Sequence, residues 1–189
     1  MSVLSDVDIG EEVAYGELEV EPVNLSEQLQ PCSLDIRVGD EVARYKSSNV
    51  IIDSRNTNAE RHLESEPLFE DESVLVEPDD FLLLNTEERV SIPPYLEAEL
   101  RGRSSYGRLG LEVHSTAGLL DPGFSGHIVL EVSNNSQHSI RLYRDDRIAQ
   151  LVFKELRTRS ETPYGEKDDS KYDGQRGAVG SRIWEEEHQ

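Results

Sequence analysis

The chain has 189 residues, and its 19 lysines and arginines against 39 aspartates and glutamates give a formal net charge of −20. This length suits one compact domain of about 100 to 200 residues, so we expect residues 1–189 to form a single domain. The acidity argues against a nucleic-acid polymer as a partner, because a phosphate backbone requires a basic footprint.

The sequence predicts a soluble protein. It contains no run of about 18 apolar residues that would cross a membrane. Its start, MSVLSDVDIGEE, lacks the basic-then-apolar order of a signal peptide. We therefore expect a cytoplasmic protein without a membrane partner.

Cysteine and lysine are both scarce. Cys32 is the only cysteine, so one chain cannot form an internal disulfide or a cysteine-based zinc cluster. Only four of the basic residues are lysines. An acidic, lysine-poor surface suits concentrated salt, where screening removes most of the self-repulsion. We expect a halophilic source, with an ordinary acidic protein as the alternative.

The chain begins with a helix and continues as strands. Ser5 and Asp8 form a capping box that predicts a helix through about Ala14. Short alternating runs broken by turns then predict strands at 33–39, 73–77, 81–84, 127–133 and 139–143. Because no helices intervene, an antiparallel all-β sandwich or barrel is expected.

Two segments show little pattern. Residues 53–72 are polar and acidic, which is typical of a long surface excursion. Residues 160–180 are rich in Gly, Lys, Asp and Tyr and have little apolar periodicity, which predicts a mobile tail.

The stretch from Leu100 to Gly110 carries the first candidate site. Ser104 is expected to be the N-cap of a short helix that ends by Gly110. Arg103, two hydroxyl groups and the helix amides would then form a phosphate cradle. Ser104 and Arg108 lie four residues apart and so share one face. Solvated arginines beside a capped turn are the alternative.

The next candidate is the turn Asp121-Pro122-Gly123, which is expected to aim Asp121 and Phe124 in the same direction. A carboxylate acceptor beside an aromatic ring can hold a sugar. The ring would close the side on which a 2′-hydroxyl would lie. The alternative is a loop aspartate that only completes an Asx-turn.

Glu131 lies within a predicted strand between apolar neighbours. Alternation places Ile128, Leu130 and Val132 on one face and directs Glu131 to the other. A partly desolvated carboxylate at this position is suited to proton transfer. A strand glutamate that simply faces solvent is the alternative.

These residues together resemble a known family. Residues 102–110 read Gly-Arg-Ser-Ser-x-x-Arg-Leu-Gly, and residues 114–131 read His-x-Thr-Ala-x-x-x-Asp-Pro-Gly-Phe-x-Gly-x-Ile-x-Leu-Glu. This order resembles the deoxycytidine triphosphate (dCTP) deaminases of the trimeric dUTP pyrophosphatase superfamily. The likeness extends to Pro31-x-Ser-x-Asp-x-Arg37, Arg147–Leu151, Tyr164 and Lys171-Tyr-x-x-Gln175-x-Gly177.

The resemblance implies a distorted jelly-roll, a dUTPase-like β-barrel with a flexible C-terminal lid at residues 160–189. It also implies a homotrimer with sites between subunits, and Mg²⁺ carried by the triphosphate. Zinc deaminases need a Pro-Cys-x-x-Cys motif, which one cysteine cannot supply. A zinc-independent deaminase is therefore expected, with the substrate dCTP as its nucleotide partner.

The resemblance also implies the role of each residue. Glu131 would handle the proton of the attacking water, while Ser104 and Arg108 position that water. Arg103, Ser104 and Ser105 would meet phosphates, and Asp121 and Phe124 the deoxyribose. Backbone groups around Val129 and Leu130 would read the base. The remaining substrate-binding residues implied are Gln150 and, on the lid, Tyr164, Lys171 and Gln175.

Three functions remain open on the sequence. The first is deamination of dCTP to dUTP, which feeds thymidylate synthesis. The second is a bifunctional enzyme that also cleaves the triphosphate to give dUMP and pyrophosphate. Gly118 beside Ala117 would leave room for that chemistry, whereas Leu119 is not the large aromatic residue expected with it. The third is a nucleotide-sensing protein without activity, against which the presence of Ser104, Arg108 and Glu131 argues.

Overall fold

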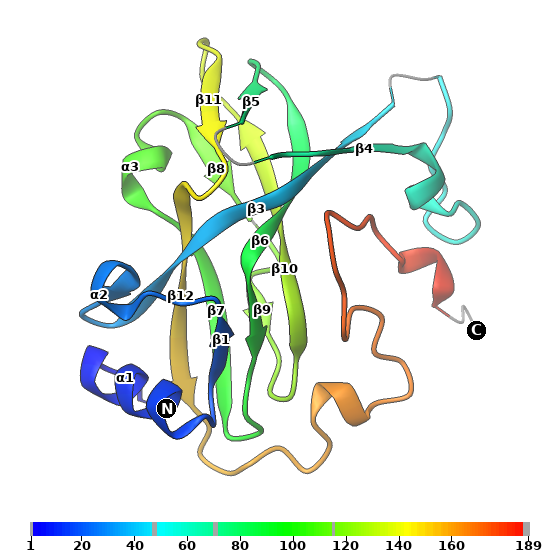
Figure 1. Ribbon diagram of the computed structural model, residues 1–189. Coiled ribbons are helices and arrows are strands. Elements are labelled where there is room, and N and C mark those ends of the chain that lie inside the picture. The colour runs from blue at the N-terminus through cyan, green and yellow to red at the C-terminus, as the bar shows by residue number, and fades with distance from the viewer. Residues whose placement is uncertain (1, 47–48, 70–71, 115, 187–189) are drawn as a thin grey trace.

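The computed structural model describes residues 2–46, 49–69, 72–114 and 116–186. Antiparallel strands make up most of it (Figure 1). The strands are β1 (Glu19–Glu21), β2 (Leu29–Gln30), β3 (Ser33–Tyr45), β4 (Leu63–Pro67), β5 (Ser73–Val76), β6 (Phe81–Ser91), β7 (Leu96–Gly102), β8 (Leu111–Val113), β9 (Leu119–Leu120), β10 (Ser125–Asn134), β11 (Ile140–Tyr143) and β12 (Arg147–Glu155). The helices are α1 (Asp6–Tyr15), α2 (Leu25–Gln28), α3 (Ser104–Gly107), η1 (Ala59–His62), η2 (Tyr164–Glu166) and η3 (Ile183–Glu185).

The strands form one large curled sheet and one small sheet. The large sheet has the order β8-β10-β6-β3-β12-β7-β9, with β1, β2 and β4 attached at its side, and the small sheet pairs β11 with β5. Every described strand pair is antiparallel. The prediction of an all-β antiparallel fold with a short N-terminal helix is therefore confirmed.

The predicted capping box begins α1. The Ser5 hydroxyl accepts a hydrogen bond from the Asp8 amide at 3.3 Å, and the Asp8 carboxylate accepts one from the Ser5 amide at 2.8 Å. Two of the free amides at the helix start are thereby satisfied. The helix ends at Tyr15, one residue later than expected, because Gly16 adopts a left-handed conformation with φ of 75°.

Strand β10 alternates as the sequence predicts. Ile128, Leu130 and Val132 are buried in the main hydrophobic cluster, whereas Val129 and Glu131 are half-buried on the other face. β10 pairs with β6 along most of its length and with β8 at its end. The pairing with β6 fixes the direction in which Glu131 projects.

Five strands begin within two residues of a predicted run, whereas β7 and β12 match none. The strands on either side of the turn at 78–80, β5 and β6, do not pair with each other, because β5 pairs with β11 and β6 with β10, β3 and β1. The expected excursion at 53–72 contains η1 and β4, and β4 pairs with β3 from Leu63 to Pro67. Residues 70–71 of that excursion lie outside the described residues.

The segment after β12 lies against the body of the protein and carries only the short helices η2 and η3 in its described part. It follows β10, because the Gly174 amide donates to Ser125 O at 2.6 Å and the His127 amide donates to Gln175 O at 3.0 Å. Residues 187–189 of the predicted lid lie outside the described residues.

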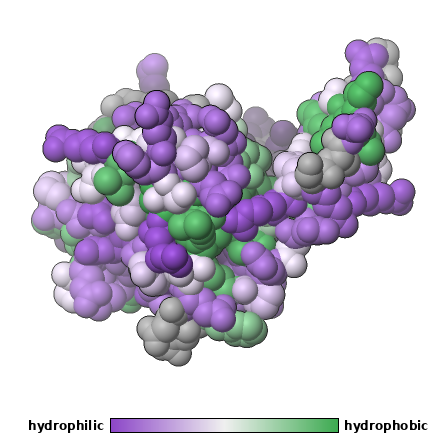
Figure 2. Space-filling view, turned by 90° about the horizontal axis from the view of Figure 1, so that it is seen from above, coloured by the Kyte–Doolittle hydropathy of each residue, from purple (hydrophilic) through white to green (hydrophobic). Residues whose placement is uncertain are grey.

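The surface agrees with the composition. The face in Figure 2 is mostly hydrophilic, with hydrophobic residues visible in limited places. No described helix has the length and apolar character needed to span a membrane, since the longest, α1, has 10 residues.

Candidate active site

A cavity of about 490 Å³ lies between β10, the end of β3 and the C-terminal segment. Its walls combine aromatic and apolar side chains with two carboxylates. The lining residues are Tyr45, Phe81, Leu83, His114, Ala117, Leu119, Leu120, Asp121, Phe124, Ile128, Val129, Glu131, Tyr164, Tyr172, Gln175, Val179, Gly180 and Ser181.

The predicted turn places Asp121 and Phe124 on the same wall of this cavity. The Phe124 amide donates to Asp121 O at 3.1 Å, and Gly123 takes the positive φ of 86° that the turn requires. Phe124 is 7% exposed, and its ring centroid lies 6.1 Å from that of Tyr164. An acceptor and a buried aromatic face thus meet at one end of the cavity.

Glu131 projects into the same cavity from β10. Its backbone oxygen accepts a hydrogen bond from the His114 amide at 2.7 Å, which ties the chain after β8 to this strand. His114 has a φ of 54° and lines the cavity beside Glu131, and its Nε2 lies 2.8 Å from Ala117 O. The His114 Nδ1 is buried without a hydrogen-bonding partner among the described residues.

Three tyrosines in the wall bind the C-terminal segment through their hydroxyl oxygens. The Tyr164 hydroxyl accepts from the Tyr172 amide and the Tyr172 hydroxyl from the Arg182 amide, both at 3.1 Å. Burial raises the pKa of Tyr45, the hydrogen bond from the Ser181 amide opposes this shift, and the negative charge of Glu131 adds to it. Two of these bonds lie within the C-terminal segment, and the bond to Tyr45 joins that segment to the end of β3.

Gln175 is held by two bonds to one residue of β10. Its Nε2 donates to His127 O at 2.8 Å, and its own backbone oxygen accepts from the His127 amide. The Gln175 Oε1 is buried and has no hydrogen-bonding partner among the described residues. This acceptor is fixed in the cavity wall and available to a donor group.

The predicted phosphate cradle lies elsewhere. Helix α3 packs near β8 on the left of Figure 1, whereas the C-terminal segment lies on the right. Ser104, Ser105 and Arg108 are exposed and do not line the cavity. Within one chain, the Glu131 cavity and the α3 group are therefore two separate surfaces.

The N-cap of α3 was predicted one residue too late. Arg103 occupies this position, with extended φ and ψ of −77° and 136°, and no side chain caps the helix. The reason is that the Arg103 amide still donates to Ile148 O of β12 at 2.9 Å. Because the strand ladder runs through Arg103, Ser104 becomes the first helical residue.

Arg103 is already engaged with a buried carboxylate. Its Nε lies 3.3 Å from Asp35 Oδ1, and Arg147 lies 3.5 Å from the other oxygen. Asp35 is 1% exposed, so burial raises the pKa of its carboxyl and the two arginines oppose the shift. The Arg103 Nη1 also donates to Arg147 O at 2.8 Å.

The cavity brings together six of the predicted site residues: Asp121, Phe124, Val129, Glu131, Tyr164 and Gln175. Three others are engaged elsewhere. Leu130 is fully buried in the core, Gln150 accepts from the Ser33 hydroxyl at 3.0 Å, and Lys171 pairs with Glu186.

Sequence reasoning missed part of the wall. Tyr45, Phe81 and Ser181 come from the end of one strand, the start of another and the C-terminal segment. No local pattern marks them, because only the sheet pairing and the path of the last residues bring them to Glu131. Tyr172 lies in the Lys171–Gly177 motif, next to Lys171, and its place in that motif could have indicated a site residue.

The described residues that line the cavity include two carboxylates, Asp121 and Glu131, and no lysine or arginine. Such a wall suits a neutral base and a sugar. It does not by itself neutralise a phosphate chain, which requires arginine, lysine or a metal ion.

The chain is similar to known proteins over most of its length. The sequence model of the family described as dCTP deaminase-like matches residues 3–156. The "dCTP deaminase, dUMP-forming" of Methanosphaera stadtmanae is 40% identical over 189 residues, covering 98% of this chain and 96% of the relative. The "dCTP deaminase" of Natronomonas pharaonis is 42% identical and covers 96% and 94%.

A solved structure shares the fold. The 2′-deoxycytidine 5′-triphosphate deaminase of Agrobacterium tumefaciens superposes with a TM-score of 0.65 at 22% identity. The match covers 81% of this chain and 47% of that chain, so this chain spans about half of its length. On the family match and the identity to relatives over nearly their full length, the chain belongs to the dCTP deaminase-like family.

Proposed function

We propose that this protein deaminates dCTP, using water to give dUTP and ammonia. The observation that carries the proposal is the meeting of Glu131 with Asp121 and Phe124 in one cavity. These are the expected base and the expected sugar contacts. The relatives named dCTP deaminase support the same substrate.

In the proposed reaction, Glu131 accepts a proton from a water molecule whose oxygen attacks C4 of cytosine. The protons then pass to N3 and to the exocyclic nitrogen, the bond from C4 to that nitrogen breaks, and ammonia leaves. Water is consumed and no oxidant or reductant is needed. The half-buried position of Glu131 favours this role, because a positioned carboxylate in a mostly apolar wall transfers protons efficiently.

The substrate lies along the cavity in this proposal. Asp121 accepts from the deoxyribose hydroxyl, the Phe124 ring closes the 2′ side, and backbone groups around Val129 and Leu130 meet the base. Tyr164, Lys171 and Gln175 of the C-terminal segment close over the nucleotide. The unpartnered Gln175 Oε1 is an acceptor, so it suits a donor group of the base or sugar and not the phosphate oxygens. Mg²⁺ enters as part of the substrate, bound to the phosphate oxygens it prefers.

We propose a homotrimer in which a neighbouring subunit completes each site. The cavity wall lacks a described cationic side chain, and the exposed α3 group offers Ser104, Ser105 and Arg108 away from it. Arg103 precedes them in the chain. Because its Nε pairs with Asp35 and its Nη1 donates to Arg147 O, only the rest of its guanidinium group can bind a ligand. A second copy that presents α3 to the cavity would supply the missing charge and position the water.

The product is dUTP in this proposal, and the glycine at position 118 has a structural explanation of its own. A Cβ atom on Gly118 would lie 2.6 Å from Leu100 O, and the Leu100 amide donates to Gly118 O at 2.7 Å. The glycine is explained by this strand contact and does not bear on the product. The relatives include proteins named with and without "dUMP-forming".

The test is a time course with labelled dCTP that resolves dUTP, dUMP and ammonia, run on the protein and on Glu131→Gln. We expect dUTP and ammonia in equal amounts from the protein. Glu131→Gln should bind dCTP but turn over about 10²- to 10⁴-fold more slowly, the usual range for a lost general base. Glu17→Gln, on an exposed loop, is the control. Near-normal turnover by Glu131→Gln would refute this base, and dUMP formed without free dUTP would replace dUTP as the product.

Activity should depend on Mg²⁺ and not on zinc. Cys32 is exposed, and the cavity lining offers one histidine with two carboxylates. No group of three or more metal-binding side chains is arranged around a common point in the described parts of the chain. We expect full turnover in a zinc-selective chelator with excess Mg²⁺. Loss of activity that only Zn²⁺ restores would contradict the mechanism.

A further inference from the structure

Arg182 joins the C-terminal segment to the η1–β4 segment, residues 59–67. Its Nε lies 3.4 Å from Glu60 Oε1, and both side chains are about one-third exposed. Glu60 belongs to η1, inside the excursion that showed no pattern in the sequence. The excursion thus provides a surface against which the last described residues pack.

The same arginine contacts the residues that close the cavity. Its guanidinium carbon lies 6.0 Å from the centroid of the Tyr172 ring, and its amide donates to the Tyr172 hydroxyl. Its Nη1 donates to Lys171 O at 2.5 Å. Tyr172 lines the cavity, and Lys171 is a proposed nucleotide contact. Arg182 therefore acts on the cavity indirectly, through its contacts with Tyr172 and Lys171.

The fit between the two segments is close. A Cβ atom on Gly180 would lie 2.6 Å from Leu63 Cδ1 and 3.3 Å from Glu60 Cγ. Ala178 is 3% exposed and packs with Ala43 of β3 and Leu83 of β6. Residues 178–182 therefore follow one path over the η1–β4 segment, and Gly180 and Ser181 on that path line the cavity.

We propose that Arg182 is a positioning residue, and that its ion pair with Glu60 holds Tyr172 and residues 179–181 against the nucleotide cavity. The η1–β4 segment thereby sets how well the site closes over a bound nucleoside triphosphate. This role rests on the proposed function, because the substrate whose binding it improves is dCTP. Arg182 contacts neither the base nor the reacting water.

The expected effects follow from the exposure of the pair. A partly exposed ion pair contributes weakly, so Glu60→Gln should raise KM for dCTP about threefold. Arg182→Met also removes the bond to Lys171 O and the contact with Tyr172, so KM should rise about tenfold. In both variants kcat should stay within about twofold, because the lost contacts are equal in ground and transition states. Arg182→Lys keeps the charge and should recover part of the loss.

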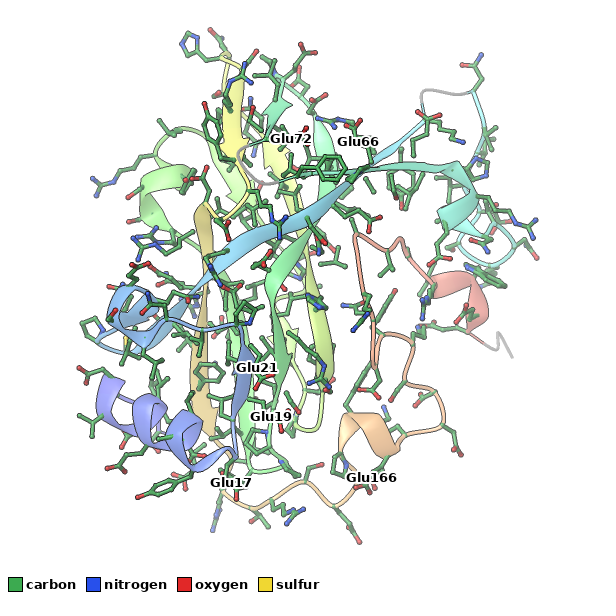
Figure 3. All side chains as sticks on the ribbon, in the orientation of Figure 1. Glu17, Glu19, Glu21, Glu66, Glu72 and Glu166 are labelled. Atoms are coloured by element: carbon green, nitrogen blue, oxygen red, sulfur yellow. The ribbon has the colours of Figure 1, made fainter. Side chains whose placement is uncertain are left out.

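A matched control comes from the same η1–β4 segment. Glu66, labelled in Figure 3 on β4, pairs with Arg44 at 3.6 Å, across the β3–β4 ladder. Glu66→Gln removes one carboxylate from the same β3–β4 ladder. It should leave KM and kcat unchanged.

The experiment combines steady-state kinetics on dCTP with amide hydrogen exchange of residues 172–182, measured without nucleotide. Exchange should be about tenfold faster in Arg182→Met and about threefold faster in Glu60→Gln. The double variant should equal Arg182→Met, because the pair is already broken there. If the protein did not deaminate dCTP, the proposed function would fail while the exchange result would still test the contact.

Three results would overturn the proposal. The first is exchange at residues 172–182 that is unchanged in Arg182→Met. The second is additive effects of the Glu60 and Arg182 substitutions, which would mean that the two side chains act separately. The third is a fall in kcat at constant KM, which would place Arg182 in the chemical step.

Discussion

Three carboxyl groups in this chain have different surroundings and different expected roles. Asp35 and Glu88 are buried, at 1% and 0% exposure, and each is paired with arginine. Glu131 is half-buried in a cavity wall with no arginine among its described lining. A buried pair fixes structure, because removing one partner strands a charge. An accessible carboxylate in a cavity can instead meet a substrate.

Glu88 gives a pH prediction. It accepts from Arg37 Nε at 2.7 Å, the Arg37 amide at 2.9 Å and Gln28 Nε2 at 2.8 Å. Burial raises its pKa, and the Arg37 contacts offset this only partly. A carboxyl whose pKa is raised by folding stabilises the fold fully below its ordinary pKa, and this contribution is lost as pH rises through the raised value.

Glu88→Gln mimics the protonated form. The Tm of the protein minus the Tm of this variant should therefore fall as pH rises above 4.5, the ordinary pKa of a glutamate. Thermal melts in constant salt measure it. Glu17→Gln, with an exposed side chain, controls for the loss of one negative charge. A difference that grows with pH would mean that the arginine pairing outweighs burial.

At the residue scale, the sequence predicts the site residues whose direction is set by strand alternation or by a turn. Glu131 follows from the two-residue period of β10, and Asp121 with Phe124 follows from a Pro-Gly turn. Tyr45 and Ser181 do not follow from any local rule. They reach the cavity only because distant segments pack together, which a single sequence does not encode locally.

At the scale of elements, the contact between β9 and β7 shows how the distance between two backbones can require a glycine at one position. The loop before β9 approaches β7 so closely that Gly118 has no space for a side chain. The pairing Ala98↔Leu120 and Glu99↔Leu119 follows directly after this contact. A glycine in such a place reports close backbone approach.

Gly118→Ala should therefore destabilise the fold by about 1 to 3 kcal/mol, the range for forced overpacking. Gly10→Ala is the matched control, because Gly10 lies in α1 with nothing within 4 Å of a Cβ atom. That substitution should stabilise by about 0.5 to 1 kcal/mol. Chemical denaturation of both variants gives the comparison, and equal stabilities would show that β9 shifts freely.

Local signals locate α1 and parts of five strands. The capping box marks α1, and the alternating runs mark β3, β5, β6, β10 and β11, since these signals are local. No predicted run matches β7 or β12, and the runs stop before the ends of β3 and β6. The pairing of β5 with β11 joins residues about 67 apart in sequence, from Val76↔Ile140 to Ser73↔Tyr143, and no turn encodes it. The start of α3 shifts because strand pairing at Arg103 overrides the preference of serine for the cap.

For the whole molecule, the acidic charge is dispersed. The labelled glutamates in Figure 3 come from β4, η2, the region around β1 and the loop before β5, and they lie on different sides of the protein. Along the sequence the charge is uneven: the nine basic and six acidic residues from Arg101 to Arg159 sum to +3, so the rest of the chain carries −23. Repulsion among the acidic side chains weakens with screening.

Stability should rise with KCl into the molar range, and more steeply if the subunits associate, because association brings like-charged surfaces together. Thermal melts from low to molar KCl measure this. An uncharged osmolyte at matched osmolality separates screening from general solute exclusion. A flat or falling Tm in KCl would contradict adaptation to concentrated salt.

The sharpest whole-molecule prediction concerns the two surfaces that one chain keeps apart. If each site takes Glu131 from one subunit and Arg108 from the next, Glu131→Gln and Arg108→Ala chains should each be inactive alone. Trimers assembled from an equal mixture should recover about a quarter of normal activity. A site is intact only when an Arg108→Ala chain supplies Glu131 and the next subunit, a Glu131→Gln chain, supplies Arg108. Each of these two positions is filled correctly with a chance of one half.

The mixture is prepared by co-expression with two different tags, and native mass spectrometry counts the mixed assemblies. A doubly substituted chain mixed with the unsubstituted protein is the control, because there an intact site arises only between two unsubstituted neighbours, again about one quarter of the total. Recovery in the first mixture requires that the two groups act across an interface. Mixed trimers that form but stay inactive would mean that Arg108 and Glu131 serve the same subunit, and α3 would then have to move to the cavity within one chain.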